Sequence, residues 1–300
     1  MLPPMLLQIA LFVFVTLQAS SPAREAVDDL IAADRAFGAA SANAANVIEG
    51  LSPMFADDVA VPVPGSRFTA TKAGAIDAMR ANADNVDGRA DWAPVRGGIS
   101  ADGRHGFTFG YMTVRKPDAS VVNLKYLAYW IKTPAGWRVA VYRRRPRADG
   151  AVPTEMMAPS LPARWTGAGG DAKAIEAARQ SLDAAERSFS TEAQSMGLGA
   201  AFAKWGRADS INMGPPTVAR FILGAPEIAK SVGAGTPTNS SPVVWAPDRV
   251  IVAASGDLGV TIGMIRPNAP GADGKPQPPI PFFTIWRRDG LNGPWRYIAE

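Results

Sequence analysis

The second half of this 300-residue chain repeats the pattern of its first half at an offset of 152 to 153 residues. The matched segments keep the same order: 33–37 with 185–189, 67–68 with 220–221, 92–94 with 245–247, and 106–110 with 259–263. An internal repeat indicates that one structural unit occurs more than once. The chain is therefore predicted to fold as two copies of one domain, which agrees with its length.

Each copy begins with helical periodicity and ends with strand-like segments. In copy two, Ile175, Leu182 and Phe189 fall on one helical face, and in copy one Asp34 interrupts the corresponding apolar stripe. β-Branched and aromatic residues predict strands over 107–114, 121–131 and from 137, and in copy two over 250–252, 259–265, 282–287 and 295–298. Helices followed by antiparallel hairpins predict an α+β fold, in which the helices pack on one curved sheet.

An apolar run at 5–17 marks the amino end of the chain. It is shorter than a membrane span of about 20 residues but has the length of a signal-peptide core, and small residues follow it. We predict cleavage between Ser20 and Arg24, a secreted or periplasmic location, and no stable membrane span after cleavage. The alternatives are an uncleaved anchor and a mistaken start. The predicted organisation is a signal peptide (1–23), copy one (24–147), an exposed Pro/Gly-rich linker (148–172) and copy two (173–300).

Composition excludes several kinds of chemistry. The chain has no Cys and a single His, His105, so metal sites built on Cys or on several His are excluded, as is catalysis by a histidine pair. We expect no metal site and no cofactor. The net charge is +4, and the one basic cluster, 143–147, lacks interleaved aromatic residues. It predicts a solvent-exposed domain edge and no nucleic-acid partner. Glycines around His105 predict a surface turn.

Short motifs in each copy support a family resemblance. In copy one they are Phe55-Ala56-Asp57-Asp58-Val59, Pro64-Gly65, Gly74-Ala75-Ile76, Tyr129-Trp130-Ile131-Lys132 and Gly136-Trp137-Arg138-Val139. Copy two keeps Ile285-Trp286-Arg287-Arg288 and Trp295-Arg296, while its middle segment, 206–210, is degraded. On these motifs each copy resembles a nuclear transport factor 2-like (NTF2-like) domain of the SnoaL and ketosteroid-isomerase superfamily, closest to a group of unknown function. The resemblance implies two tandem cone-shaped domains, each with three helices closing over a curved antiparallel sheet that surrounds a cavity.

The same resemblance locates the acid and base of the isomerase members. In copy one those positions hold Val63 and Ala128, and in copy two they hold Met213 or Gly214, and Thr284. Val and Ala cannot exchange a proton, so a steroid-isomerase mechanism is disfavoured and no catalytic residue is predicted. The candidate ligand-binding residues, all in copy one, are Asp58, Phe109, Tyr111, Tyr126 and Trp130. Each has a structural alternative, namely backbone capping for Asp58 and sheet packing for the aromatic residues.

Three functions follow, because this fold hosts enzymes, binding proteins and association modules. The prediction is an exported, non-catalytic protein that binds a small apolar ligand or a partner. The second possibility is a lyase, cyclase or isomerase that uses Asp58 or Asp34 with a tyrosine in copy one, and the third is an association module. An Asp inside the copy-one cavity within reach of Tyr111 or Tyr126 would favour an enzyme. Because an uncovered apolar sheet face is an association site, we also predict that the two sheets pair as an intramolecular pseudo-dimer.

Overall fold

Both copies fold into helices followed by a sheet. The computed structural model describes residues 21–63 and 67–300, so the predicted signal-peptide core and the Pro64-Gly65 motif lie outside the described residues. Copy one contains α1 (Pro22–Ser41), α2 (Val47–Leu51), a 3-10 turn (Ser52–Met54), β1 (Phe55–Ala60), α3 (Lys72–Arg80), α4 (Ala83–Asp87), β2 (Arg89–Ile99), β3 (His105–Arg115), β4 (Val121–Thr133) and β5 (Gly136–Pro146). Copy two contains α5 (Ala172–Met196), α6 (Leu198–Trp205), β6 (Gly206–Asn212), β7 (Ile222–Leu223), α7 (Ala225–Gly233), β8 (Val243–Val252), β9 (Leu258–Pro267), β10 (Ile280–Arg287) and β11 (Arg296–Ala299).

The two sheets share one strand order. The five-stranded sheet of copy one runs β1-β5-β4-β3-β2, and the six-stranded sheet of copy two runs β7-β6-β11-β10-β9-β8. In each copy the first strand (β1 or β6) pairs in parallel with the last strand (β5 or β11), while the long central strands pair antiparallel. The predicted α+β class with two tandem domains is confirmed. β1, β2 and β6 were not predicted as strands, and copy one has the short α4 in addition to the three predicted helices.

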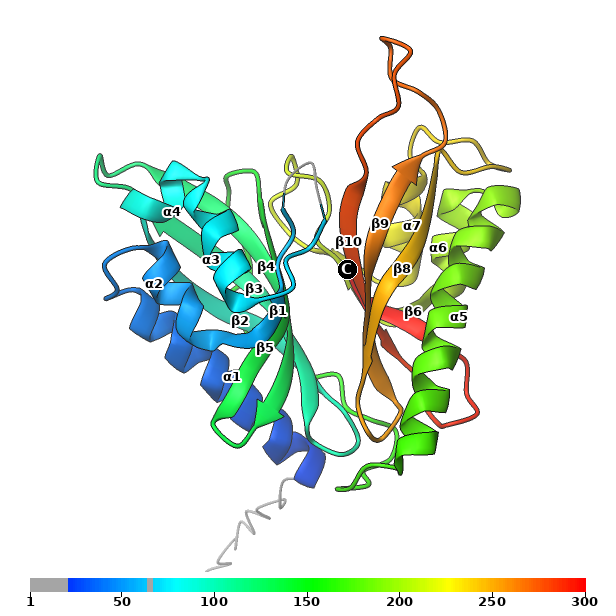
Figure 1. Ribbon diagram of the computed structural model, residues 1–300, viewed down its shortest axis with the longest axis horizontal. Helices are drawn as coiled ribbons and strands as arrows, with labels where there is room; N and C mark the ends of the chain where they lie inside the picture. Colours follow the sequence, from blue (N-terminus) through cyan, green and yellow to red (C-terminus); the bar gives the residue numbers. More distant parts are fainter. Residues whose placement is uncertain (1–20, 64–66) are drawn as a thin grey trace, which may run out of the picture.

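The first helix of each copy packs against its own sheet, on the outer side of the molecule (Figure 1). The Ser21 side chain accepts the Arg24 N–H at 3.3 Å and so caps α1, and Asp171 accepts the Ala174 N–H at 2.8 Å and caps α5. Each helix buries one apolar stripe that also contains a carboxyl group. None of the helices within 21–63 and 67–300 combines the length and the apolarity that a membrane crossing requires.

The repeated Trp-Ala-Pro sequence produces the same irregularity in β2 and β8. The pairing with the next strand shifts register immediately after Pro94 and after Pro247. Proline lacks the N–H of a regular ladder, and a bulge in an edge strand accommodates it. The residues paired with these prolines are Gly110 and Gly263. A Cβ on Gly110 would lie 2.1 Å from the Ala93 carbonyl oxygen, and a Cβ on Gly263 would lie 2.0 Å from the Ala246 carbonyl oxygen.

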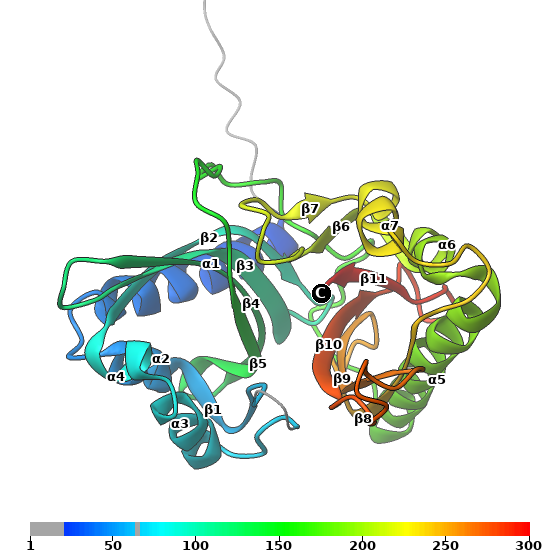
Figure 2. The same cartoon turned by 90° about the horizontal axis from the view of Figure 1, so that it is seen from above.

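The two copies meet through the sheet faces that point away from their own helices (Figures 1 and 2). Apolar side chains of both sheets form one buried cluster there, which includes Phe109, Leu127, Val260, Phe283 and Ile285. Burying a side chain of this size contributes about 1.5–3 kcal/mol. The predicted pairing of the two copies as a pseudo-dimer is therefore confirmed. Because side chains alternate along a strand, neighbouring residues of β10 point instead into copy two.

Two equivalent ion pairs flank this interface. Arg96 donates to a carboxylate oxygen and to the main-chain oxygen of Asp209, each at 2.6 Å. Arg249 donates to the same two groups of Asp58. Both arginines follow the repeated prolines and both aspartates lie on the first strand of a copy, so the contacts are those of an isologous dimer. This arrangement corrects the prediction of Asp58 as a cavity acid, because its carboxylate faces the other copy.

The segment predicted as an exposed linker lies along the edge strand β2. Met157 N–H donates to the Val95 oxygen at 2.7 Å, and Ser160 N–H donates to the Gly97 oxygen at 2.9 Å. Ile99 N–H in turn donates to the Ser160 oxygen at 3.1 Å. An edge strand presents unpaired N–H and C=O groups, and the linker satisfies part of this edge. Most of the segment is exposed, as predicted, and the backbone contacts that dock it at Met157 and Ser160 leave no periodic pattern in the sequence.

Candidate functional site

Copy two contains an apolar cavity of about 240 Å³ between its helices and its sheet. Its volume lies just below the range of about 300–1,000 Å³ that is typical of small-molecule sites. Eleven of the sixteen lining residues are apolar: Phe189, Leu198, Phe202, Met213, Val232, Val243, Trp245, Ile265, Ile280, Phe282 and Phe283. The cavity therefore suits a small apolar ligand.

Polar groups also line this cavity. Asn212 and Glu300 come from copy two, whereas Arg143 and Arg145 come from β5 of copy one. The Asn212 amide donates to Glu300 Oε1 at 2.6 Å. Burial raises the pKa of Glu300 to about 8, although the hydrogen bond from Asn212 and the charge of Arg143 oppose this shift. At neutral pH the Glu300 side chain is thus mostly protonated and the two guanidinium groups supply the side-chain charge of the cavity.

Trp245, one wall of the cavity, is held by a buried carboxyl group. Its indole N–H donates to Glu186 Oε1 at 2.6 Å. Trp286 donates to Glu186 Oε2 at 2.9 Å, and the Thr261 hydroxyl donates to the same oxygen. Burial raises the pKa of Glu186 to about 7, and these three hydrogen bonds partly offset the shift. Glu186 is fully buried and does not line the cavity, so its evident role is to position the two indoles.

Copy one contains the counterpart of this network. Asp34 accepts the Trp92 indole N–H and the Tyr126 hydroxyl, each at 2.7 Å. The Trp130 indole donates to Thr108 at 2.8 Å. Burial raises the pKa of Asp34. The carboxyl, the first tryptophan and the threonine recur at offsets of 152, 153 and 153 in the sequence, so the interrupted apolar stripe already contained a signal for this network.

A second pocket, of about 340 Å³, lies in copy one beside α3, α4 and the ends of the strands. Its polar side chains other than that of Arg143 are already paired. Arg144 donates to the Asn85 side chain, and Lys116 forms an ion pair with Asp84 at 2.7 Å. The pocket therefore has less capacity for a polar ligand group than its volume suggests.

The five residues predicted to bind a ligand do not form one site. Asp58 lies in the inter-copy ion pair. Phe109 and Tyr111 point toward copy two. The centroid of the Phe221 ring lies 4.7 Å from that of Phe109 and 5.3 Å from that of Tyr111. Tyr126 and Trp130 point into copy one. Among the described residues, neither of the two pockets is lined by any of the five.

The positions that correspond to the isomerase acid and base have different surroundings in the two copies. Met213 and Thr284 both line the cavity of copy two. Ala128 is fully buried in the core of copy one, and the backbone of Val63 pairs with that of Arg67. In copy two the cavity thus presents a thioether and a hydroxyl from two of the residues (Met213 or Gly214, and Thr284) that the resemblance aligns with the isomerase acid and base.

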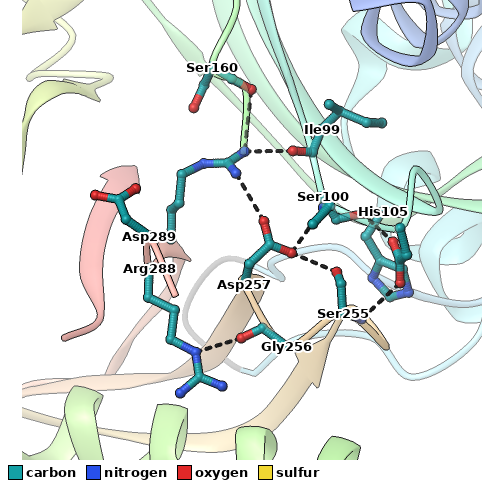
Figure 3. Close-up of polar contacts among 12 residues, drawn as sticks. Ile99, Ser100, His105, Ser160, Ser255, Gly256, Asp257, Arg288 and Asp289 are labelled. Carbon is teal, nitrogen blue, oxygen red and sulfur yellow. Dashed lines mark hydrogen bonds and ion pairs between the residues drawn. The ribbon is translucent and has the colours of Figure 1, made fainter. Parts of the chain in front are cut away.

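A polar cluster lies where the β2–β3 and β8–β9 turns of the two copies meet (Figure 3). Ala101 N–H donates to Asp257 at 3.0 Å, and Ser255 N–H donates to Asp102 at 3.0 Å. The buried Arg287 forms an ion pair with Asp257 at 3.2 Å. Arg287 also donates across the interface to the Ile99 oxygen at 2.8 Å, although its Nε has no hydrogen-bond partner among the described residues. We assign the cluster to the docking of the two copies.

His105 lies beside this cluster and is not a surface residue. It is half-buried, and its Nδ1 lies 3.0 Å from the hydroxyl of the buried Tyr129. Burial lowers the pKa of His105, whereas the charges of Asp102 and Asp257 oppose the shift. The predicted turn lies at 101–104 and packs against copy two, whereas His105 is the first residue of β3.

Comparison with solved structures identifies proteins that are similar to one copy at a time. An NTF2-like protein with a cystatin-like fold from Novosphingobium aromaticivorans is 17% identical, covers 39% of this chain and 79% of its own, and gives a TM-score of 0.31. A putative calcium/calmodulin-dependent protein kinase II association domain from Xanthomonas campestris is 15% identical, with coverage of 46% and 100% and a TM-score of 0.32. A ketosteroid isomerase-like protein from Erwinia carotovora atroseptica is 17% identical, with coverage of 42% and 98% and a TM-score of 0.32.

Each of these structures covers 39–46% of the chain. No protein-family model and no curated protein matches the chain.

Proposed function

We propose that this protein is an exported, non-catalytic binding protein that takes a small apolar ligand into the cavity of copy two. The observation that carries the proposal is the cavity itself, which is lined mainly by apolar side chains inside a rigid frame of helices and sheet. The ligand-binding residues predicted from the sequence all lie in copy one. The positions of the two pockets and of their polar groups favour a ligand site in copy two.

The chemistry of the cavity supports binding over catalysis. General acid–base catalysis needs a titratable group within hydrogen-bond reach of the substrate. Met213 and Thr284 replace the isomerase carboxyl groups, and Glu186 lies behind Trp245 with its hydrogen bonds already made. Glu300 is the one carboxyl side chain that lines the cavity, and it is bonded to Asn212.

One observation favours the second candidate, an enzyme in copy one. Tyr126 donates to Asp34 at 2.7 Å, which is the Asp–Tyr pair that such a lyase, cyclase or isomerase would use. However, both side chains are at most 1% exposed and neither lines the copy-one pocket formed by the described residues. Glu186 in copy two likewise accepts an indole N–H but no tyrosine hydroxyl, and its full burial supports a packing role for both carboxyl groups. Turnover of a small organic molecule that is lost in Asp34→Asn but retained in Val232→Trp would establish an enzyme in copy one.

Calorimetric titration with 1-octanol tests the proposed ligand site. Val232→Trp should fill the copy-two cavity and weaken octanol binding at least tenfold. Val122→Trp, which places the same side chain in the copy-one pocket, is the matched control and should leave the affinity unchanged. The opposite pattern would place the ligand in copy one, and failure of the wild-type protein to bind octanol would contradict the proposed apolar site.

Export is tested separately by amino-terminal sequencing of protein purified from its native host. A mature chain that begins between Ser20 and Arg24 is expected. A chain that retains Met1 would contradict export through a cleaved signal.

A further inference from the structure

The basic cluster 143–147 is divided between the two copies by the alternation of β5. Tyr142 and Arg144 point into copy one, where Arg144 donates to Asn85. Arg143 and Arg145 therefore project from the opposite face of the sheet, toward copy two, and both line its cavity. The prediction of a solvent-exposed edge was wrong at these two positions, because the second copy covers this face.

The two arginines lack the partners that guanidinium groups normally have. Within residues 21–63 and 67–300, neither Arg143 nor Arg145 forms a hydrogen bond or an ion pair with its side chain. Burial and the neighbouring charge of Arg145 lower the pKa of Arg143 to about 10, although the charge of Glu300 opposes the shift, so Arg143 is still charged at neutral pH. Burial also lowers the pKa of Arg145. Two like charges that are partly buried beside a mostly protonated Glu300 are unfavourable, and such local conflicts are typical of functional sites.

We propose that Arg143 and Arg145 of copy one form the anion-binding end of the copy-two cavity, so that the ligand is a small amphipathic carboxylic acid. This inference rests on the proposed ligand site and specifies its substrate class. A guanidinium group matches the geometry of a carboxylate and can bind both of its oxygens. The apolar part of the acid would occupy the space beside Phe189, Phe202 and Trp245. The site is complete only when both copies are present, which gives the fusion of the two domains a function.

A pair of ligands that differ only in their head group tests the proposal in the full chain. Octanoate should bind the wild-type protein at least tenfold more tightly than 1-octanol, because hydrogen bonds between a guanidinium group and a carboxylate are charge-assisted. In Arg143→Gln/Arg145→Gln the affinity for octanoate should fall to that for octanol. Octanol binding should be retained, which also shows that the variant is folded.

Two further variants complete the test. Arg138→Gln, on the same strand, is the matched control and should bind both ligands as the wild type does, since its guanidinium donates to the Trp137 oxygen and does not line the cavity. Arg143→Lys/Arg145→Lys should recover part of the octanoate affinity. Equal affinities of the wild type for octanoate and octanol, or unchanged octanoate binding in the double Gln variant, would overturn the anion site and leave the apolar site intact. Failure of the wild type to bind either ligand would overturn both proposals.

Discussion

A buried carboxyl group stands at the same residue position in each copy and organises the aromatic side chains around it. Asp34 and Glu186 both lie on the buried face of the first helix and both accept an indole N–H. A buried carboxyl group is unfavourable when ionised, and hydrogen bonds from buried donors offset part of that cost. Titration of Asp34 and Glu186 therefore affects stability.

The pH dependence of stability should report Glu186. Its pKa in the folded protein is about 7, above the ordinary value of 4.5. The folded state therefore keeps a proton that the unfolded chain releases, so the contribution of Glu186 to stability is full below about pH 4.5 and is lost as the pH rises through 7. From pH 4 to pH 8, the free energy of unfolding of the wild type relative to Glu186→Gln should fall by about 3 kcal/mol, as measured by urea denaturation.

Glu192→Gln provides a contrast for that measurement. The hydrogen bond from Lys204 lowers the pKa of Glu192, so its stabilising contribution should be lost as the pH falls. The two variants should therefore differ from the wild type with opposite pH slopes. Parallel profiles for the wild type and Glu186→Gln would contradict the assignment.

At the scale of elements, the bulged edge strands β2 and β8 are the feature that the repeat preserves most completely. Each combines a Trp-Ala-Pro sequence, a register shift after the proline and a facing glycine. The bulge redirects the strand so that the following arginine reaches the other copy. The element thus links local backbone chemistry to the pairing of the domains.

Substitution of the facing glycine should disrupt this element. In Gly263→Ala the new Cβ would lie 2.0 Å from a backbone oxygen, and the bulge would have to rearrange. We expect a loss of about 1–3 kcal/mol in the free energy of unfolding, measured by thermal or urea denaturation. Gly290→Ala is the control, since no atom lies within 4 Å of the added Cβ, and it should be close to neutral. Equal stability of the two variants would show that the bulge tolerates a side chain.

At the scale of the whole molecule, the chain reproduces a two-fold dimer within one polypeptide. The sheets share a buried apolar cluster, and the repeated arginines each contact the first strand of the other copy. The symmetry is approximate, because the two ion pairs differ in burial. The Arg96 side chain is 6% exposed, whereas that of Arg249 is 37% exposed.

This asymmetry predicts unequal costs for equivalent substitutions. Arg96→Met should lower the free energy of unfolding by about 2 kcal/mol, because it removes buried charge-assisted hydrogen bonds to Asp209 and to the linker oxygen of Ala158. Arg249→Met should cost less than about 1 kcal/mol, as is usual for exposed ion pairs. Urea denaturation of both variants provides the comparison. Equal costs would indicate that the interface is more symmetric than the burial of these side chains implies.

The sequence alone determined the repeat, the α+β class and the pairing of the sheets, because these depend on patterns that recur along the chain. It missed β1, β2 and β6, since Pro94 and the short polar stretches conceal strands that are stabilised only by their neighbours in the sheet. The sequence pattern also showed that Asp34 interrupts an apolar helical stripe. It did not show that Glu186 is the counterpart of Asp34 in copy two.

The location of the candidate site was decided only by the tertiary structure. The sequence pattern could not tell which face of each strand would be covered, so Phe109 and Tyr111 were expected in a cavity and instead lie between the sheets. Likewise, Arg143 reaches the cavity of copy two only because the copies pack face to face. Local patterns encode which residues alternate along an element. The contacts that turn those residues into a site form between segments far apart in the sequence, and these are set by how the whole chain packs.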